Sequence, residues 1–280
     1  MDVAINAKFL DVTRGAYNVS KPPRWGPPGS TNKDSQCGQG MALFMGIVPP
    51  ASRAKALAVM VQNAKDSHDI TGACQGGATL SASCKTAKGG AGPHMTAGLF
   101  GIKWFLMALA DGGLNDLAYD VITSTTYPGY RWMMHNEYAN ATTLWESWFV
   151  SDNTFSHNHP MFASSEVWLV QSIGGLQPHP AAKGMDRILI KPSPPTKLQN
   201  ASLSYDTPRG RVTIAWSRQA GGKLLVETTV PPNVLATVHI PSRSNTTVRE
   251  SGVPLLGGRR EAASLVVEVG SGTYAFESQF

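Results

Sequence analysis

The sequence predicts an α+β protein of two domains, in which pairs of antiparallel helices are followed by an antiparallel β-sandwich. In the first part, apolar residues recur at helical spacing in segments joined by short turns. After Gly175, prolines punctuate the chain and the apolar period falls to two, which is typical of short strands. We therefore predict a helical domain of residues 1–178 and a sandwich domain of residues 179–280, with the boundary near Pro178.

Three helical hairpins follow a short helix near the start of the sequence. The predicted helical segments are residues 3–15, 39–47, 51–65, 97–110, 114–123, 143–149 and 160–173. Pro50 favours a helix start because proline tolerates the first helical position, and Gly112 with Gly113 favours a break. Residues 21–30 are predicted to be a loop, and residues 71–93 a surface insertion. Successive antiparallel pairs of this kind are typical of helical bundles and toroids.

Short strands, each bounded by turn residues, account for the second domain. The clearest are residues 187–191, 212–216, 224–227, 237–240, 265–269 and 273–276. We expect seven or eight strands in all. Strands this short and this regularly spaced indicate an antiparallel sandwich of roughly a hundred residues.

Composition and charge exclude several classes of function. The formal net charge of +5 is spread over both halves without a run of Lys or Arg, which argues against a nucleic-acid surface. No apolar run is long enough to cross a membrane, and no signal peptide is recognisable at the start. Cys74 and Cys84 are expected either to pair or to remain free thiols. Acceptor sequons are compatible with secretion, so the localisation stays open; they lie at Asn18, Asn140, Asn200 and Asn245.

Residues 127–159 combine aromatic side chains, a carboxylate and two histidines, which is the set of groups that a sugar site needs. Glu146 lies between Trp145 and Trp148, three residues after Thr143. One interpretation is a capping box, in which the glutamate reaches back to the start of a helix. The other is a carboxylate that activates water beside a sugar. The two are compatible, because a carboxylate has two oxygens.

The histidines have both functional and structural interpretations. His157 and His159 lack a third ligand at metal-binding spacing, so we predict neither a metal nor a cofactor. The letters His-Asn-His also occur in a nuclease motif, but no flanking pattern or basic groove supports it. We consider a hydrogen bond to a ligand hydroxyl and a structural role equally open for both. His94 has the same two interpretations, and a structural role is the simpler.

The aromatic residues of this stretch form the core between helices, a sugar platform, or both. Trp132 and Trp145 are the candidates for stacking on a sugar ring, since they lie close in sequence to Glu146 and the histidines.

The same residues resemble a known family, the bacterial-type alpha-L-rhamnosidases among the six-hairpin glycosidases. The helical part matches at Gln36 and at residues 42–50, 96–101, 116–119, 127–130, 141–148 and 156–159. The second part matches at residues 188–192, 205–210, 230–233 and 272–276. The matching segments follow the order of the family over nearly the whole chain.

The resemblance implies part of an (alpha/alpha)6 toroid, about half of its helices, followed by a C-terminal β-sandwich. It also implies inverting hydrolysis of terminal alpha-L-rhamnosides in a rhamnose-containing glycoside or polysaccharide. The glutamate of the Thr-Thr-x-Trp-Glu segment, here Glu146, is similar to the general base of the family. A histidine of the later loop, here His159, is similar to a rhamnose contact.

The sequence departs from the family in the region that would carry the general acid. We find six or seven helices where the full toroid has about twelve, and no acidic cluster in residues 1–33. The leading hypothesis is therefore a fragment or one piece of a split enzyme, which requires a missing N-terminal half or partner chain. The alternatives are a non-catalytic carbohydrate-binding or scaffold protein, and a polysaccharide lyase on a related barrel.

Overall fold

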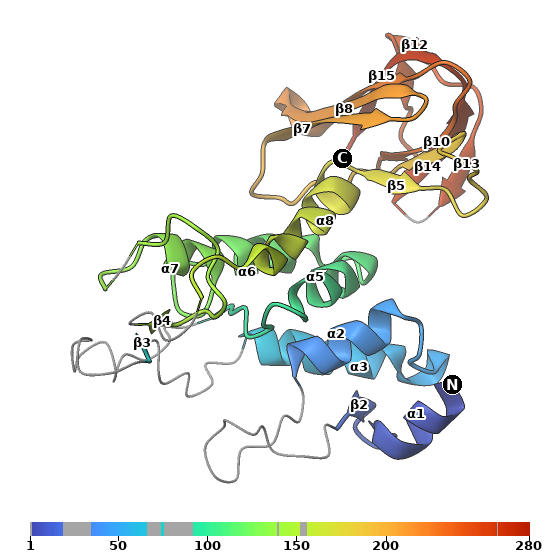
Figure 1. The fold of residues 1–280 in the computed structure, drawn as a ribbon. Helices are drawn as coiled ribbons and strands as arrows, with labels where there is room; N and C mark the ends of the chain where they lie inside the picture. Colours follow the sequence, from blue (N-terminus) through green and yellow to red (C-terminus); the bar gives the residue numbers. More distant parts are fainter. Residues whose placement is uncertain are drawn as a thin grey trace. The chain divides into compact units, whose positions relative to one another are not determined.

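The computed structural model describes residues 2–18, 35–65, 74–75, 92–138, 140–151, 156–261 and 263–280. The chain forms two compact units, Met1–Ser165 and Glu166–Phe280, which we describe separately (Figure 1). The domain limits expected from the sequence, 1–178 and 179–280, place the division later in the chain and stay a prediction. The loop expected at residues 21–30, nearly all of the insertion at residues 71–93, and Cys84 lie outside the described residues.

The first unit is mainly helical. Its helices are α1 (Asp2–Phe9), α2 (Gln36–Phe44), α3 (Pro50–Lys65), α5 (Ile102–Asp111), α6 (Asn115–Thr123), α7 (Tyr130–Met134) and the short 3₁₀ helix η1 (Pro160–Ser165). Two small strand pairs accompany them: β1 (Leu10–Asp11) with β2 (Ala16–Tyr17), and β3 (Cys74–Gln75) with β4 (Val150–Ser151).

The hairpins α2–α3 and α5–α6 confirm the predictions from helical periodicity. α3 begins at Pro50, as expected for a residue that lacks an N–H donor. α2 packs closely on α5 at Gly40, where an added Cβ would lie 2.8 Å from the backbone N and Cα of Phe105. Glycine is needed at this position because any side chain would push the two helices apart.

The start of the chain differs from the predicted helix of residues 3–15. α1 ends at Phe9, and the chain then turns back between β1 and β2. Asp11 accounts for the change, because its Oδ1 accepts hydrogen bonds from the N–H groups of Thr13 and Arg14, each at 3.1 Å. Such a side chain offers the backbone an alternative to continuing the helix.

The predicted third hairpin is wrong in its first half. Residues 143–149 are not helical, and the short helix α7 lies earlier in the chain. The second half, residues 160–173, is helical but changes type along its length, from η1 through α8 (Glu166–Trp168) to the π-helical turn η2 (Leu169–Ile173).

The second unit is a two-layered sheet structure that follows α8 and η2. Its strands are β5 (Leu176–Pro178), β6 (Arg187–Ile190), β7 (Asn200–Thr207), β8 (Gly210–Gln219), β9 (Lys223–Val230), β10 (Leu235–Pro241), β11 (Arg249–Glu250), β12 (Val253–Pro254), β13 (Arg259–Glu261), β14 (Ser264–Val269) and β15 (Gly272–Gln279). One sheet has the order β13-β14-β10-β6-β5, and the other has the order β12-β11-β15-β9-β8-β7.

The predicted β-sandwich is confirmed, although one strand pair, β6 with β10, is parallel. Alternate residues of the central strands point inward, as the period of two required. Trp216 and Phe276 lie fully buried between the layers. The indole Nε1 of Trp216 donates to the carbonyl of Ile173 at 2.7 Å, so this buried polar group is paired.

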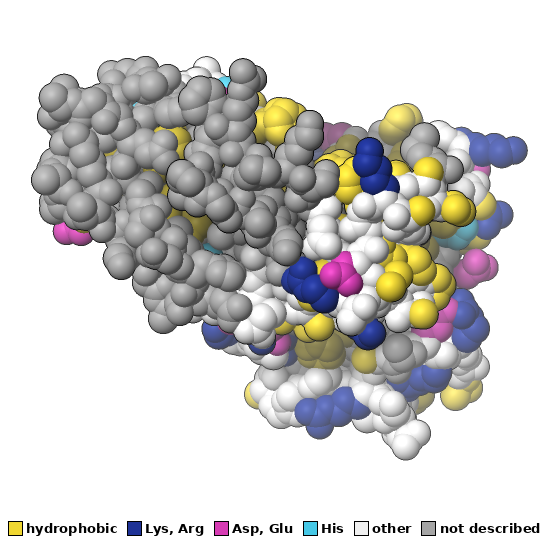
Figure 2. All heavy atoms as spheres, turned by 90° about the horizontal axis from the view of Figure 1, so that it is seen from below, with side chains coloured by type: hydrophobic (Ala, Val, Ile, Leu, Met, Phe, Trp, Pro, Cys, Tyr) yellow, Lys and Arg dark blue, Asp and Glu magenta, His cyan; other side chains and the backbone are white. Residues whose placement is uncertain are grey.

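The described residues on the face that Figure 2 shows carry no concentrated charge. Lys and Arg side chains are scattered there, interspersed with acidic and apolar groups (Figure 2). Within the described part of the chain, no helix is both long and apolar enough to cross a membrane.

Candidate active site

The helical unit contains an open pocket of about 550 Å³ with Glu146 in its wall. Its described lining is mostly apolar and aromatic: Cys37, Gly98, Leu99, Phe100, Gly101, Tyr127, Glu146, Ser147, Trp148, Phe149 and Phe162. Glu146 is the one carboxylate in this set. Apolar walls with a few polar groups are typical of small-molecule sites, and the volume lies in their usual range.

Glu146 is held by pairing between two short segments of the chain. Its backbone N–H donates to the carbonyl of Ser156 at 2.8 Å, and the N–H of Ser156 donates to its Oε2 at 3.0 Å. The N–H of His159 donates to the carbonyl of Leu144 at 2.7 Å. The predicted capping box is therefore wrong, because Oε2 binds this distant backbone N–H and the helix it would cap does not form. The second carboxylate oxygen is bound by no residue in the part of the chain that the structure describes.

Trp148 lines the pocket and is held by three contacts. Its Nε1 donates to the carbonyl of Ala97 at 2.9 Å. Its ring meets Tyr130 and Phe162 edge-on, with centroids 5.0 and 4.6 Å away. Packing of this kind stabilises an aromatic cluster beyond the area that it buries. These contacts fix the position of the indole in the pocket wall.

A buried amide, that of Gln36, positions the segment on which Trp148 depends. Gln36 is the first residue of α2 and is 1% exposed. Its Nε2 donates to the carbonyl of His94 at 2.8 Å, and its Oε1 accepts from the N–H groups of Thr96 and Ala97 at 2.9 and 3.0 Å. One side chain thereby pairs with three backbone groups of residues 94–97, the segment that leads to Gly98 in the pocket lining.

Burial keeps two tyrosines of the cluster protonated. It raises the pKa of Tyr127 to about 12 and that of Tyr130 also to about 12. The hydroxyl of Tyr130 donates to the carbonyl of Phe162. Burial likewise raises the pKa of the Cys37 thiol, which favours the neutral form over the reactive thiolate. The two tyrosine hydroxyls and the Cys37 thiol are therefore neutral at neutral pH.

These tyrosines predict a loss of stability at alkaline pH. Because their pKa values are higher in the folded chain than in the unfolded one, their contribution is complete below pH 10. It is lost as the pH rises from about 10 to about 12. We expect Tyr127→Phe to remove about 2 kcal/mol of this loss, as measured by urea unfolding over that pH range. Exposed Tyr205 provides the control, and an equal effect of Tyr205→Phe would contradict the prediction.

The other predicted site residues are close in sequence to residues that line the pocket. None of them belongs to its described lining. Trp145 is buried and stacks on His157 with centroids 4.9 Å apart. Trp132 is buried and meets Tyr127 edge-on at 4.9 Å. His94 is fully buried, and its backbone N–H donates to the carbonyl of Ala64 at 2.8 Å. Burial favours structural roles for these three, and their roles in binding stay predictions.

Several residues that line the pocket were not predicted from the sequence to be part of a site. Phe100 is 67% exposed and lies between Gly98 and Gly101 just before α5. At Gly101, an added Cβ would approach the Cβ of Cys37 to 2.7 Å, so this turn sits directly on α2. The two glycines that flank Phe100, Gly98 and Gly101, were the feature of the sequence that could have indicated a site here. Among the described residues, no group of three potential metal ligands is present.

Two family models match adjacent parts of the chain. The bacterial alpha-L-rhamnosidase 6 hairpin glycosidase domain matches residues 78–173. The bacterial alpha-L-rhamnosidase C-terminal domain matches residues 175–253.

Curated relatives agree with these matches. A protein named alpha-L-rhamnosidase from Streptomyces avermitilis is 29% identical over 65% of this chain and 18% of its own length. One of the same name from Formosa agariphila is 27% identical over 67% of this chain and 21% of its own length. The chain thus spans about a fifth of the length of these relatives.

Solved structures share the fold along the whole chain. The alpha-L-rhamnosidase of Dictyoglumus thermophilum superposes with a TM-score of 0.76 at 24% identity, covering 99% of this chain and 27% of that one. The structure of the Streptomyces avermitilis enzyme complexed with L-rhamnose gives a TM-score of 0.72 at 24% identity, covering 99% and 23%.

The helical unit, with a carboxylate in an aromatic pocket, therefore matches part of a six-hairpin glycosidase domain. The two parts of the chain match the two C-terminal domains of bacterial alpha-L-rhamnosidases, the 6 hairpin glycosidase domain and the domain that follows it, as its motifs had indicated.

Proposed function

We propose that this chain supplies the water-activating half of an inverting glycosidase that acts on terminal alpha-L-rhamnosides. The observation that carries the proposal is the position of Glu146, the one carboxylate among the described residues that line the aromatic pocket. The names of the relatives support the choice of sugar. The activity of the whole protein is part of this proposal.

In the proposed reaction, Glu146 accepts a proton from a water molecule as the water attacks the anomeric carbon. The hydrogen bond from Ser156 to Oε2 fixes the carboxylate, which leaves the other oxygen to receive the proton. Trp148, Tyr127 and Phe162 provide the apolar surface against which the sugar packs. Water that attacks the anomeric carbon from the side opposite the departing oxygen gives a product of inverted configuration.

An inverting reaction also needs an acid to protonate the departing oxygen. The two carboxyl groups of such enzymes lie roughly 6.5 to 9.5 Å apart, which leaves room for the water. No second carboxylate belongs to the described lining of this pocket. We therefore propose that the acid comes from a preceding segment or a partner chain, as the resemblance implies.

His159 is proposed as a contact to a hydroxyl of the sugar. It lies on the segment that pairs with residues 144–146, so its position is coupled to that of Glu146. Its Nδ1 is buried and has no hydrogen-bond partner among the described residues. A buried polar group without a partner is costly, which a ligand hydroxyl would relieve. We propose His157 as a support for Trp145, on which it stacks.

Binding of L-rhamnose to the folded chain tests the location of the site. An added Cβ at Gly98 meets no atom within 4 Å, so Gly98→Trp places a large side chain at the pocket without displacing the backbone. We expect saturation-transfer NMR to show rhamnose signals with the wild type and to lose them with this variant.

Gly270→Trp is the matched control, since Gly270 also has open space around it but lies in the sheet unit. We expect it to bind rhamnose as the wild type does. Binding that survives in Gly98→Trp, or no binding by the folded wild type, would contradict the proposed site.

A further inference from the structure

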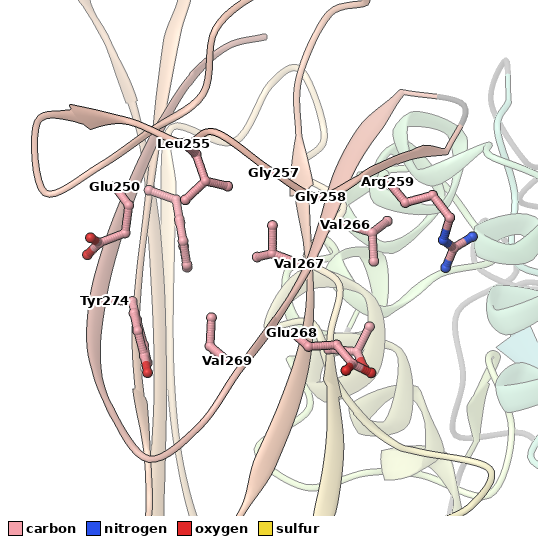
Figure 3. A pocket seen from close by; sticks show the side chains of 12 residues that line it. Glu250, Leu255, Gly257, Gly258, Arg259, Val266, Val267, Glu268, Val269 and Tyr274 are labelled. Carbon is pink, nitrogen blue, oxygen red and sulfur yellow. The ribbon is translucent and has the colours of Figure 1, made fainter.

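The sheet unit contains a second and larger cavity, between the margins of its two sheets. It measures about 660 Å³ and is open to solvent. Figure 3 shows the side chains of Leu255, Val267 and Val269 within the space between the sheets. Those of Glu250 and Arg259 are directed away from it on opposite sides (Figure 3). The cavity is thus apolar inside and charged at its two margins.

The cavity is open because the edge strands are too short to close the sandwich. β12 has two residues and β13 has three. The connection between them lies close to β14 at Gly258, where φ is +104° and an added Cβ would lie 2.8 Å from the carbonyl oxygen of Val266. Only glycine allows the chain to lie this close to β14, because glycine has no Cβ. The shape of the cavity at this point therefore depends on Gly258.

An exposed leucine lies at the mouth of this cavity. Leu256 is 98% exposed and stands between Leu255 and Gly257, both of which line the cavity. Val253, in the adjacent strand β12, is 65% exposed. An exposed apolar side chain and an apolar cavity therefore lie side by side on the same edge of the sheet unit. Exposed apolar surface next to a cavity marks an interaction site more often than an isolated leucine does.

We propose that this margin is a self-association surface, in which Leu256 of each copy enters the cavity of a second copy. In a twofold dimer the same patch serves both partners, so a projection beside a cavity is self-complementary. Removing one leucine from a protein core leaves a space of roughly 150 Å³. A cavity of 660 Å³ therefore has room for both Leu256 and Val253 of the second copy.

The charges at the margins favour the same partner. Glu250 lies on the sheet at one side of the cavity, and Arg259, together with the acidic Glu268, lies on the sheet at the other (Figure 3). A twofold axis between the copies that runs along the strands exchanges the two sides, which brings Glu250 of each copy opposite Arg259 of the other. Arg259 also meets Glu261 within its own chain, yet its side chain remains 69% exposed. Complementary charge of this kind fixes the register of an interface.

Sedimentation velocity of the full chain at rising concentration tests the proposal. We expect the wild type to pass from monomer to dimer, and Leu256→Glu to weaken the dimer roughly tenfold or more. Val269→Phe should weaken it similarly by filling the cavity while leaving Leu256 unchanged. Val3→Glu is the matched control, because Val3 is an 83% exposed apolar residue of α1 in the helical unit, and it should leave the dimer intact.

Exchanging the two charges distinguishes this specific interface from nonspecific association. Glu250→Arg and Arg259→Glu should each weaken the dimer, and the double variant should restore it. Thermal unfolding of each variant confirms that the sheet unit is folded. A wild type that stays monomeric at every concentration, or a dimer that survives both Leu256→Glu and Val269→Phe, overturns the proposal.

Discussion

Replacing Glu146 with glutamine is expected to lower kcat/KM for rhamnoside hydrolysis by about 10²- to 10⁴-fold, because glutamine cannot accept a proton from water. Glutamine keeps the size of the side chain and an oxygen for the N–H of Ser156, so the pocket retains its shape. The sharpest substrate is alpha-L-rhamnosyl fluoride, since fluoride departs without being protonated and the reaction then needs the base but not the acid.

Glu137→Gln provides the control for this prediction, since Glu137 is exposed in the same unit and does not line the pocket. We expect it to leave the rate unchanged. The anomer formed first, followed by proton NMR, should be beta, as inversion requires. Equal rates for wild type and Glu146→Gln, or alpha product formed first, would contradict the role given to Glu146.

Replacing Gln36 with leucine is expected to lower the free energy of unfolding of the helical unit by about 3–5 kcal/mol. Leucine has a similar volume but leaves the carbonyl of His94 and the N–H groups of Thr96 and Ala97 without their partner. Each buried polar group left without a partner costs about 1–3 kcal/mol, and two of these three bonds are fully buried. Urea unfolding followed by tryptophan fluorescence measures the loss. The same variant should weaken rhamnose binding, because the carbonyl of Ala97 holds Trp148.

Gln39→Leu provides a graded comparison within the same helix. Gln39 is also buried, but its amide makes two hydrogen bonds, both to the backbone of Tyr17, and neither residue lines the pocket. We expect a smaller loss of stability and no effect on rhamnose binding. A loss for Gln36→Leu that does not exceed that for Gln39→Leu would show that the segment at residues 94–97 is held by other contacts.

The sequence was sufficient where local signals and the final structure agree. Pro50 and the pair Gly112 and Gly113 marked the limits of α3, α5 and α6, and alternation marked the central strands. Both depend on residues close in the chain, which is what periodicity and turn chemistry report.

Local reasoning failed where a distant partner decides the structure. Thr143 and Glu146 carry the spacing of a capping box, yet the chain around Ser156 supplies the backbone groups that they bind. Gln36 looked like an ordinary polar residue, and its partners lie about sixty positions away. Neither partner is recognisable without the fold, because tertiary contacts override local propensity. Glu146 itself was found by its neighbours in sequence and lies in a pocket, while its catalytic role remains a proposal.

Residues 144–146 pair with residues 156–159. The position of Glu146 is therefore set by this pairing and not by the length of the chain between the two segments. Both ends of that intervening stretch are fixed by hydrogen bonds to each other. Lengthening the chain between β4 and Ser156 therefore adds only a small entropic cost and leaves the carboxylate where it is. A chain built this way can acquire new contacts to whatever the sugar is attached to, while the group that activates water stays in place.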